Sequence, residues 1–394
     1  MAEREVVVLS GVRTAIGDYG GALKDIAPSE LGAQVIREAI KRAKIDAKQV
    51  GALALGNIIH TEAKDMYISR VAALKAGLPQ ESTAFGVNRL CGSGLQAIVS
   101  VAQMIMLGDA DIGVGGGAES MSRGGYLMPN LRWGQRMGDG GYIDMMVGAL
   151  TDPFDAVHMG ITAENIAEQW KITREAQDAF AVESHKRALA AIEKGYFKEQ
   201  ILPIELKTRK GVTVFDRDEH PRADASVEGM AKLRAAFKKD GSVTAGNASG
   251  INDGAAAVVL AEKSAAQKLG LKPMARLVSY GIAGVDPKIM GIGPVPACQQ
   301  ALARAGLKIG DIDVVEANEA FAVQAMAVAC DLKFDPAKTN PNGGAVGLGH
   351  PIGATGAILT VKAIYELQRS GGKYALVTMC IGGGQGIAAV FERL

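Results

Sequence analysis

Cys91 stands in the run V-N-R-L-C-G-S-G-L-Q-A. An apolar stretch over 84–90 precedes it, and residues 95–106 carry apolar side chains at helical spacing. This pattern predicts a strand, a tight turn and a helix, with the thiol near the helix N-terminus. Unpaired N–H groups and the helix dipole favour a thiolate there, and thiolate is the nucleophilic form of sulfur. Cys91 is a candidate for covalent catalysis, although the segment alone also fits a buried structural cysteine.

Three more polar residues stand in the C-terminal half beside predicted strands or in glycine-rich turns. Asn318 follows a strand predicted over 313–317, and Cys380 follows one predicted over 374–379. His350 directly precedes a proline in G-L-G-H-P-I-G. Because the residue before proline is pushed towards extended backbone, His350 is expected in a loop and not inside a helix.

Each of these residues has a simpler interpretation when it is considered alone. Asn318 could cap a helix, His350 could be a solvated loop histidine, and Cys380 could be core packing. Together with Cys91, however, they supply a nucleophile, a base, an oxyanion donor and a second acid/base group. That combination indicates acyl transfer.

An α/β core is expected to position these groups. The chain has 50 glycines, and short Val/Ile/Ala runs end in glycine before segments of helical periodicity. This alternation indicates α/β layers with strands buried on both faces. Residues from about 120 to 250 do not show this alternation. They contain two tryptophans, a Met-rich stretch at 132–146 and charged helices, one predicted to be capped by Thr173. We interpret them as an insertion. After it the α/β pattern resumes, and its sequence weakly resembles the first half, as in an internal duplication.

Composition excludes several function classes. A formal net charge of +1 gives no reason to expect nucleic acid or an anionic membrane as a partner. The four cysteines are widely spaced without a C-x-x-C pair, so no zinc ribbon, dithiol centre or other metal site is expected. The N-terminus has no signal-peptide pattern, and the apolar stretches, such as 320–330, fall short of a membrane span. Free thiols then favour a cytoplasmic protein. Neither a phosphate-binding loop nor a G-x-S-x-G nucleophile elbow is present.

The ordered motifs resemble those of the thiolases, in particular the short-chain acetyl-CoA acetyltransferase or β-ketothiolase type. The resemblance covers essentially all 394 residues. It runs from S-G-V-R-T-A-I-G through N-R-L-C-G-S-G-L-Q-A, G-G-G-A-E-S-M-S, H-M-G-I-T-A-E-N, T-A-G-N-A-S-G-I-N-D-G, E-A-N-E-A-F-A and G-H-P-I-G-A-T-G to C-I-G-G-G-Q-G.

The resemblance implies a role for each candidate residue. Cys91 matches the nucleophile that carries the acyl group, and His350 the histidine that activates it and helps bind the thioester oxygen. Cys380 matches the cysteine that moves a proton at the α-carbon of acetyl-CoA. Asn318 matches the asparagine that holds a water in one oxyanion hole, and the backbone N–H of Gly382 would help form the other. The implied activity is reversible: condensation of acetyl-CoA with acyl-CoA, or thiolysis of 3-ketoacyl-CoA, by a ping-pong mechanism.

The same resemblance implies a site for coenzyme A (CoA) against the insertion. His158 and Met159 would line the thioester end, Ser249 the pantetheine and Phe321 the acyl group. Further residues are expected nearer the nucleotide: Arg222, Leu150 and Phe237. Close relatives often carry serine where this chain has Gly229, so one hydrogen bond to the substrate is expected to be absent. No permanently bound cofactor is expected; CoA, acetyl-CoA and acyl-CoA are the partners.

The implied fold is the thiolase fold: two similar βαβαβ-type halves in an αβαβα arrangement, with an inserted loop domain. The N-terminal half would comprise 1–120 plus 251–272, the insertion 121–250 and the C-terminal half 273–394. The stretch 132–146 resembles the loop that joins thiolase dimers, so a homotetramer is expected.

Three other functions fit the sequence less well. A decarboxylating condensing enzyme of the same fold would pair its cysteine with two histidines, or with histidine and asparagine, and the second cysteine in C-I-G-G-G-Q-G argues against it. A catalytically silent acyl-CoA-binding protein would lack one of the four groups. An oxidoreductase would need a dinucleotide fingerprint, which the sequence does not contain.

Overall fold

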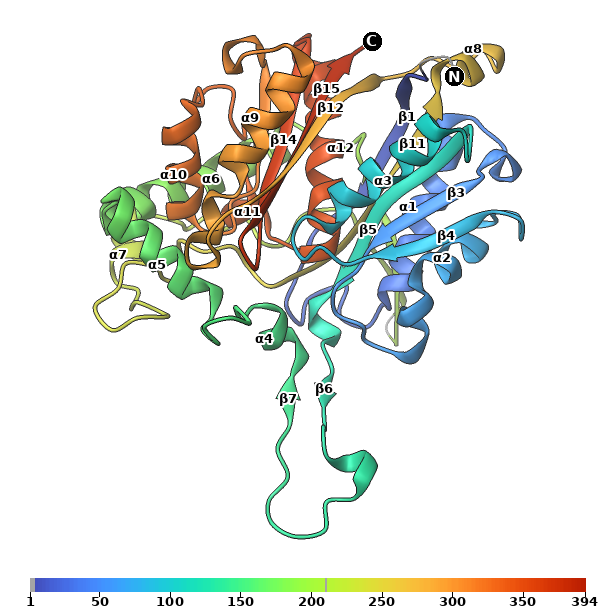
Figure 1. The fold of residues 1–394 in the computed structure, drawn as a ribbon. Helices are drawn as coiled ribbons and strands as arrows, with labels where there is room; N and C mark the ends of the chain where they lie inside the picture. Colours follow the sequence, from blue (N-terminus) through green and yellow to red (C-terminus); the bar gives the residue numbers. More distant parts are fainter. Residues whose placement is uncertain (1–3, 210) are drawn as a thin grey trace.

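One large mixed sheet organises the computed structural model, which describes residues 4–209 and 211–394 (Figure 1). Within these residues the sheet has eleven strands. Its main path, from edge to edge, is β13 (Val314–Ala317), β14 (Tyr374–Ile381), β15 (Gln385–Arg393), β12 (Ala275–Gly284), β1 (Val6–Thr14), β11 (Asn252–Glu262), β5 (Ile112–Ser120), β3 (Ala52–Gly56) and β4 (Thr83–Val87). Two short strands lie off this path, namely β2 (Gly17–Asp18) on β11 and β8 (Ile201–Leu202) on β1.

The central strands are buried, as their apolar sequences predict. β1, β5 and β11 are buried along their whole length. β5 is also rich in glycine, and a Cβ at Gly115 would lie 2.5 Å from the Cα of Ile98. Glycine therefore lets a buried helix approach this strand closely.

A pair of helices fills the space between the two halves of the sheet (Figure 1). These are α3 (Ser93–Leu107) and α12 (Ile352–Ser370), which pack against each other. α12 contacts strands of both halves, including β5, β11, β13 and β14. Outer helices cover the other sheet faces: α1 (Pro28–Ala43) and α2 (Ile68–Ala76) on one half, and α9 (Pro294–Ala305) on the other, with α10 (Ala322–Leu332) packed beside α9. This is the layered α/β arrangement expected from the sequence.

Most predicted element ends agree with the structure. Thr173 caps α6 (Arg174–Glu193), where its hydroxyl accepts a hydrogen bond from the N–H of Ala176. Gly371, with φ +76°, ends α12 in the left-handed conformation that suits glycine. The alternative interpretation of Asn318 as a helix cap is wrong, because α10 begins only at Ala322 and its cap position is Phe321.

Apart from β8, which pairs with β1, the insertion forms a group of elements between β5 and β11. Its elements are β6 (Tyr126–Leu127), β7 (Ile143–Asp144), α4 (Met145–Ala149), α5 (Met159–Trp170), α6 (Arg174–Glu193), β9 (Ile204–Thr208), β10 (Gly211–Phe215) and α7 (Val227–Ala231). The segment around β6 and β7 projects far from the rest of the molecule (Figure 1). Its large side chains are exposed, including Trp133 at 82% and Met137 at 91%.

The remaining helices are short and connect the main elements: α8 (Lys263–Lys268) and α11 (Ala345–Leu348). A buried ion pair holds α12 against β13 and the loop before α11. The Nζ of Lys362 lies 2.7 Å from the Oε2 of Glu316 and donates to the carbonyl of Gly343, also at 2.7 Å. Because α11 and α12 flank His350, the Lys362–Glu316 ion pair stabilises the loop that carries His350.

One window of the chain has the length and composition of a membrane span. The helical window 90–107 has a mean hydropathy of 1.6 over 18 residues, so the expectation that all apolar stretches fall short of a span is wrong. This window contains α3, which packs against α12, β3 and β5. Its apolar character is thus accounted for by its position at the centre of the fold.

Candidate active site

Cys91 lies in a tight turn between β4 and α3, as predicted. Leu90 has a positive φ of 44°. The Ser93 hydroxyl donates to the Leu90 carbonyl and accepts from the Arg89 N–H, both at 2.7 Å. A Cβ at Gly92 would lie 2.5 Å from the Cδ1 of Ile381 in β14. The turn that carries the thiol therefore packs closely against β14 and β15 in the second half of the sheet, and any larger residue at position 92 would displace the Ile381 side chain.

The environment of the Cys91 thiol differs from the expected one. Packed neighbouring atoms raise its pKa to about 11, and hydrogen bonds to the backbone N–H groups of Gly382 and Cys91 offset only part of this effect. The expectation that the helix N-terminus alone favours a thiolate is thus wrong for the free protein. Cys91 rests as a neutral thiol and needs a base. The two N–H groups point to the sulfur, so they lie close to where the carbonyl oxygen of an attacked thioester would become an oxyanion.

His350 provides a base in the protonation state that the reaction needs. It lies in the loop between α11 and α12 and is only 6% exposed, so the solvated-loop interpretation is wrong. Its Nδ1 lies 2.7 Å from the Thr355 hydroxyl, which itself donates to the carbonyl of Pro351. The hydroxyl has one proton, so it must accept from Nδ1–H, and Nε2 keeps its lone pair. Burial lowers the pKa of His350 to about 4, which keeps the ring neutral.

This pKa predicts how acylation of Cys91 depends on pH. The neutral imidazole is the active form, and it is lost only as the pH falls through about 4. We expect the single-turnover rate of Cys91 acylation by acetyl-CoA, measured by rapid quench, to stay level between about pH 7 and pH 5. Circular dichroism at each pH would control for unfolding. A fall in rate centred on the ordinary histidine value, about pH 6.5, would contradict this prediction.

Asn318 faces the same imidazole nitrogen. Its Nδ2 lies 3.5 Å from the Nε2 of His350, which is long for a hydrogen bond, and its Oδ1 is buried without a partner within the described residues. Its backbone is fixed because its N–H donates to the Thr378 carbonyl at 2.9 Å. The Asn318 Nδ2–H can therefore donate to a third atom, such as the oxygen of a water or of a thioester, and a water bound there could donate in turn to the Nε2 of His350.

Cys380 lies at the end of β14, buried among apolar side chains that include Met159 and Phe321. Burial raises the pKa of the Cys380 thiol well above its ordinary value, and negative charge on Cys91 raises it further. The two thiols, far apart in the chain, are thus near enough for their charges to interact. A buried neutral thiol of this kind can hold a proton ready for delivery.

Side chains of the insertion pack against the residues around the two cysteines. Met159 packs against Gly382, where a Cβ would collide with the Met159 methyl group. The ring of His158 stacks on Phe237 at 4.5 Å between centroids, and Phe237 meets Phe321 edge-on at 6.2 Å. Phe237 therefore lies with the residues of the predicted thioester end.

Two further predicted contacts also lie near the catalytic residues. Leu150 shares an apolar cluster with Cys91, so it too lies closer to the thiol than was expected for a contact to the nucleotide. Ser249 follows Ala248, which forms a bridge with Phe321, and the Ser249 N–H donates to the Ala320 carbonyl at 3.0 Å.

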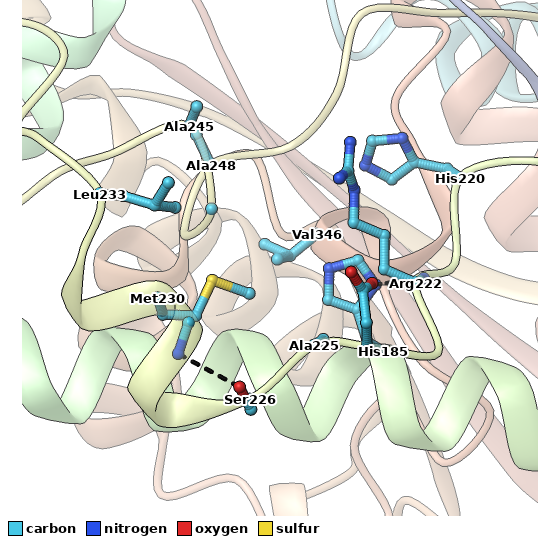
Figure 2. A pocket seen from close by; sticks show the side chains of 13 residues that line it. His185, His220, Arg222, Ala225, Ser226, Met230, Leu233, Ala245, Ala248 and Val346 are labelled. Atoms are coloured by element: carbon cyan, nitrogen blue, oxygen red, sulfur yellow. Dashed lines mark hydrogen bonds between the residues drawn. The ribbon is translucent and has the colours of Figure 1, made fainter.

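A cavity of about 380 Å³ lies within the insertion, and Arg222 is among the residues that line it (Figure 2). Figure 2 shows His185, His220 and Arg222 on one side, with Met230 and Leu233 opposite. Gly229 also lines it, and its N–H donates to the Ser226 hydroxyl at 3.1 Å. The cavity combines a cationic side chain with apolar surface, which suits a long ligand with a charged end.

Sequence reasoning missed several residues around this site. Thr355, which sets the tautomer of His350, lies in the same G-H-P-I-G-A-T-G motif, and its five-residue spacing from His350 is the signal that could have revealed it. His185 and His220 come together only through the fold, with ring centroids 6.1 Å apart. No local pattern in the sequence marks that pair.

Family comparison agrees with this geometry over nearly the whole chain. Residues 6–264 match the model of the thiolase N-terminal domain, and residues 271–393 match that of the thiolase C-terminal domain. The chain belongs to the thiolase family. It is therefore an acyltransferase, and the thiolase fold expected from the motifs is confirmed. Thiolases act on CoA substrates without a permanently bound cofactor.

Individual relatives are similar over their full length. A β-ketothiolase, BktB, of Cupriavidus necator is 64% identical, over 99% of this chain and 100% of the relative. The acetyl-CoA acetyltransferase of Syntrophomonas wolfei is 52% identical over the same shares of the two chains. Among solved structures, human mitochondrial 3-ketoacyl-CoA thiolase in complex with CoA has a TM-score of 0.97 and 44% identity, covering 99% of this thiolase and 98% of that chain.

Proposed function

We propose that this thiolase catalyses the reversible thiolysis of acetoacetyl-CoA and short-chain 3-ketoacyl-CoA through an acyl group carried on Cys91. In the reverse direction it condenses acetyl-CoA with acyl-CoA. The proposal is carried by two thiols, Cys91 and Cys380, that lie near enough for their charges to interact, together with a buried imidazole, His350, whose Nε2 is free to accept a proton. One thiol can hold the acyl group while the other moves the proton at the α-carbon.

The thiolysis steps then follow from these groups. His350 accepts the Cys91 proton at Nε2 as the sulfur attacks the 3-keto carbon, and the N–H groups of Cys91 and Gly382 stabilise the resulting oxyanion. The bond between C2 and C3 breaks, and the enolate of acetyl-CoA takes a proton from Cys380. Asn318 and His350 stabilise the enolate oxygen.

In the second half, a CoA thiol gives its proton to the Cys380 thiolate and attacks the acyl group. Cys91 leaves and recovers its proton from His350. Both cysteines and the histidine end in their starting protonation states, so the cycle is balanced. A covalent intermediate between two half-reactions gives ping-pong kinetics.

The residues around the two cysteines support a CoA thioester as the substrate. His158, Met159 and Phe321 lie at the catalytic end, with Leu150, Phe237 and Ser249 close by. Arg222 lies in the cavity beyond them, where it can pair with a phosphate. The side chains packed with Cys91 include Ile59, Ile352 and Met146, an apolar surface suited to a short acyl chain.

Steady-state thiolysis across 3-ketoacyl-CoA chain lengths, with condensation measured beside it, tests this function. We expect parallel lines in double-reciprocal plots for CoA and acetoacetyl-CoA, and rates that fall as the acyl chain grows. Release of carbon dioxide from malonyl thioesters, without thiolysis of acetoacetyl-CoA, would instead establish a decarboxylating condensing enzyme.

Three wider features belong to the same proposal. The exposed apolar side chains around β6 and β7 support a homotetramer of this thiolase, which sedimentation can test. The position of β11 between β1 and β5 supports a first half made of 1–120 and 251–272, with 121–250 as the insertion and 273–394 as the second half. Two essential reduced thiols support a cytoplasmic location.

A further inference from the structure

A hydrogen-bonded chain connects the cavity that holds Arg222 to the backbone of His350. It begins at His220, whose Nδ1 lies 2.6 Å from the Oδ1 of Asp18. The same oxygen of Asp18 accepts a hydrogen bond from the Nδ2 of Asn252 at 3.1 Å. The chain ends where the Oδ1 of Asn252 accepts the N–H of His350 at 2.9 Å.

Asn252 is built into this position. It is completely buried, and it pairs with Asp18 in the short ladder between β2 and β11. Its Nδ2 also donates to the Gly17 carbonyl at 3.1 Å, so both ends of its amide are used. A buried amide with all its partners in place is held in one orientation.

Asn252 also packs against the residue before the catalytic histidine. Gly349 has φ +104°, and a Cβ there would lie 2.5 Å from the Cγ of Asn252. The amide therefore contacts Gly349 and binds the N–H of His350, which fixes the start of the loop. Thr355 fixes the ring at its other side through Nδ1. Neither Asn252 nor Asp18 has a contact with the thiols among the described interactions.

We propose that Asn252 and Asp18 are positioning residues for His350, and that His220 connects them to the cavity that contains Arg222. The inference rests on the proposed function of His350 as the base for Cys91. A shift of about 1 Å in a catalytic group can cost about 100-fold in rate. The network should therefore affect acylation of Cys91, not the binding of CoA.

Exchanging the two side chains tests the network directly. Asn252→Asp keeps the acceptor for the N–H of His350 but removes the donor to Asp18 and sets two carboxylates against each other. We expect the single-turnover acylation rate to fall about 100-fold while the Kd for CoA, measured by calorimetry, changes less than about threefold. Adding Asp18→Asn restores one carboxylate and one amide at the two positions, now exchanged between them. The double variant should acylate Cys91 at least about tenfold faster than Asn252→Asp alone.

Two results would overturn the inference: an acylation rate of Asn252→Asp within about threefold of the unmodified enzyme, or a loss of rate that the double variant does not recover.

If Asn252→Asp fails to fold, Asp18→Ala decides, since the Asp18 side chain is 42% exposed and tolerates truncation. We expect that variant to acylate about tenfold more slowly; a rate within about twofold would contradict the inference. Tyr19→Ala, which alters an exposed neighbour of Asp18, is the matched control and should leave the rate unchanged.

The unmodified enzyme separates this inference from the proposed function. If it forms no acyl-Cys91 with acetyl-CoA, the proposed function itself is wrong. If it acylates normally and the Asn252 and Asp18 variants do too, only the positioning role is wrong.

Discussion

Replacing Cys91 with serine should lower the rate of acetoacetyl-CoA thiolysis by at least about 10⁴-fold without unfolding the enzyme. A hydroxyl is a far weaker acid than a thiol, so the neutral imidazole of His350 cannot generate the nucleophile efficiently. The turn itself should survive, because Ser93 and Gly92 shape it and the side chain at position 91 does not.

Cys330→Ser is the control for this variant, because Cys330 is an exposed cysteine on α10. We expect it to keep full activity, and circular dichroism should show both variants folded. Turnover of Cys91→Ser within about tenfold of the unmodified enzyme would mean that Cys91 does not carry the acyl group.

Replacing Cys380 with serine should separate the two halves of the chemistry. Exchange of the α-protons of acetyl-CoA with deuterated water, followed by NMR, should slow by about 10²–10⁴-fold, since a hydroxyl is a much poorer acid/base group than a thiol. Acylation of Cys91 by acetyl-CoA needs His350 and the two N–H groups for bond formation, and uses Cys380 only to protonate the CoA thiolate, a good leaving group that can depart without that proton. Its rate should therefore stay within about tenfold.

Cys298→Ser is a closely matched control for Cys380→Ser. Cys298 is also fully buried, and burial raises its pKa to about 12. It lies in a separate core cluster of the second half and has Thr378 as a hydrogen-bond partner, which could equally bind a hydroxyl. We expect normal exchange in this variant. Equal exchange in Cys380→Ser and the unmodified enzyme would assign the α-proton to another group.

Local pattern was sufficient to predict most of the elements that carry the candidate residues. The turn at Cys91, the loop at His350 and the helix that follows it all appear where glycine, proline and apolar periodicity place them. These signals depend on neighbours in the chain, so the sequence displays them directly.

Long-range contacts and protonation states could not be predicted from local sequence pattern. The Cys91 thiol was expected as a thiolate, yet packing by residues distant in the chain raises its pKa to about 11. The tautomer of His350 depends on the exact placement of the Thr355 hydroxyl. The link from His220 through Asp18 to Asn252 joins segments more than 200 residues apart. Desolvation and hydrogen bonding of this kind arise only once the fold has formed.

Peptide mass spectrometry of the acid-quenched enzyme after mixing with acetyl-CoA shows directly whether Cys91 carries the acyl group. We predict a single acetyl group, on the peptide that contains Cys91, which disappears when free CoA is added because acetyl-CoA is formed again. The acetylated species should be absent from Cys91→Ser and present in Cys380→Ser. An enzyme that turns over acetoacetyl-CoA while carrying no acetyl group, or carrying it on a residue other than Cys91, would contradict the account.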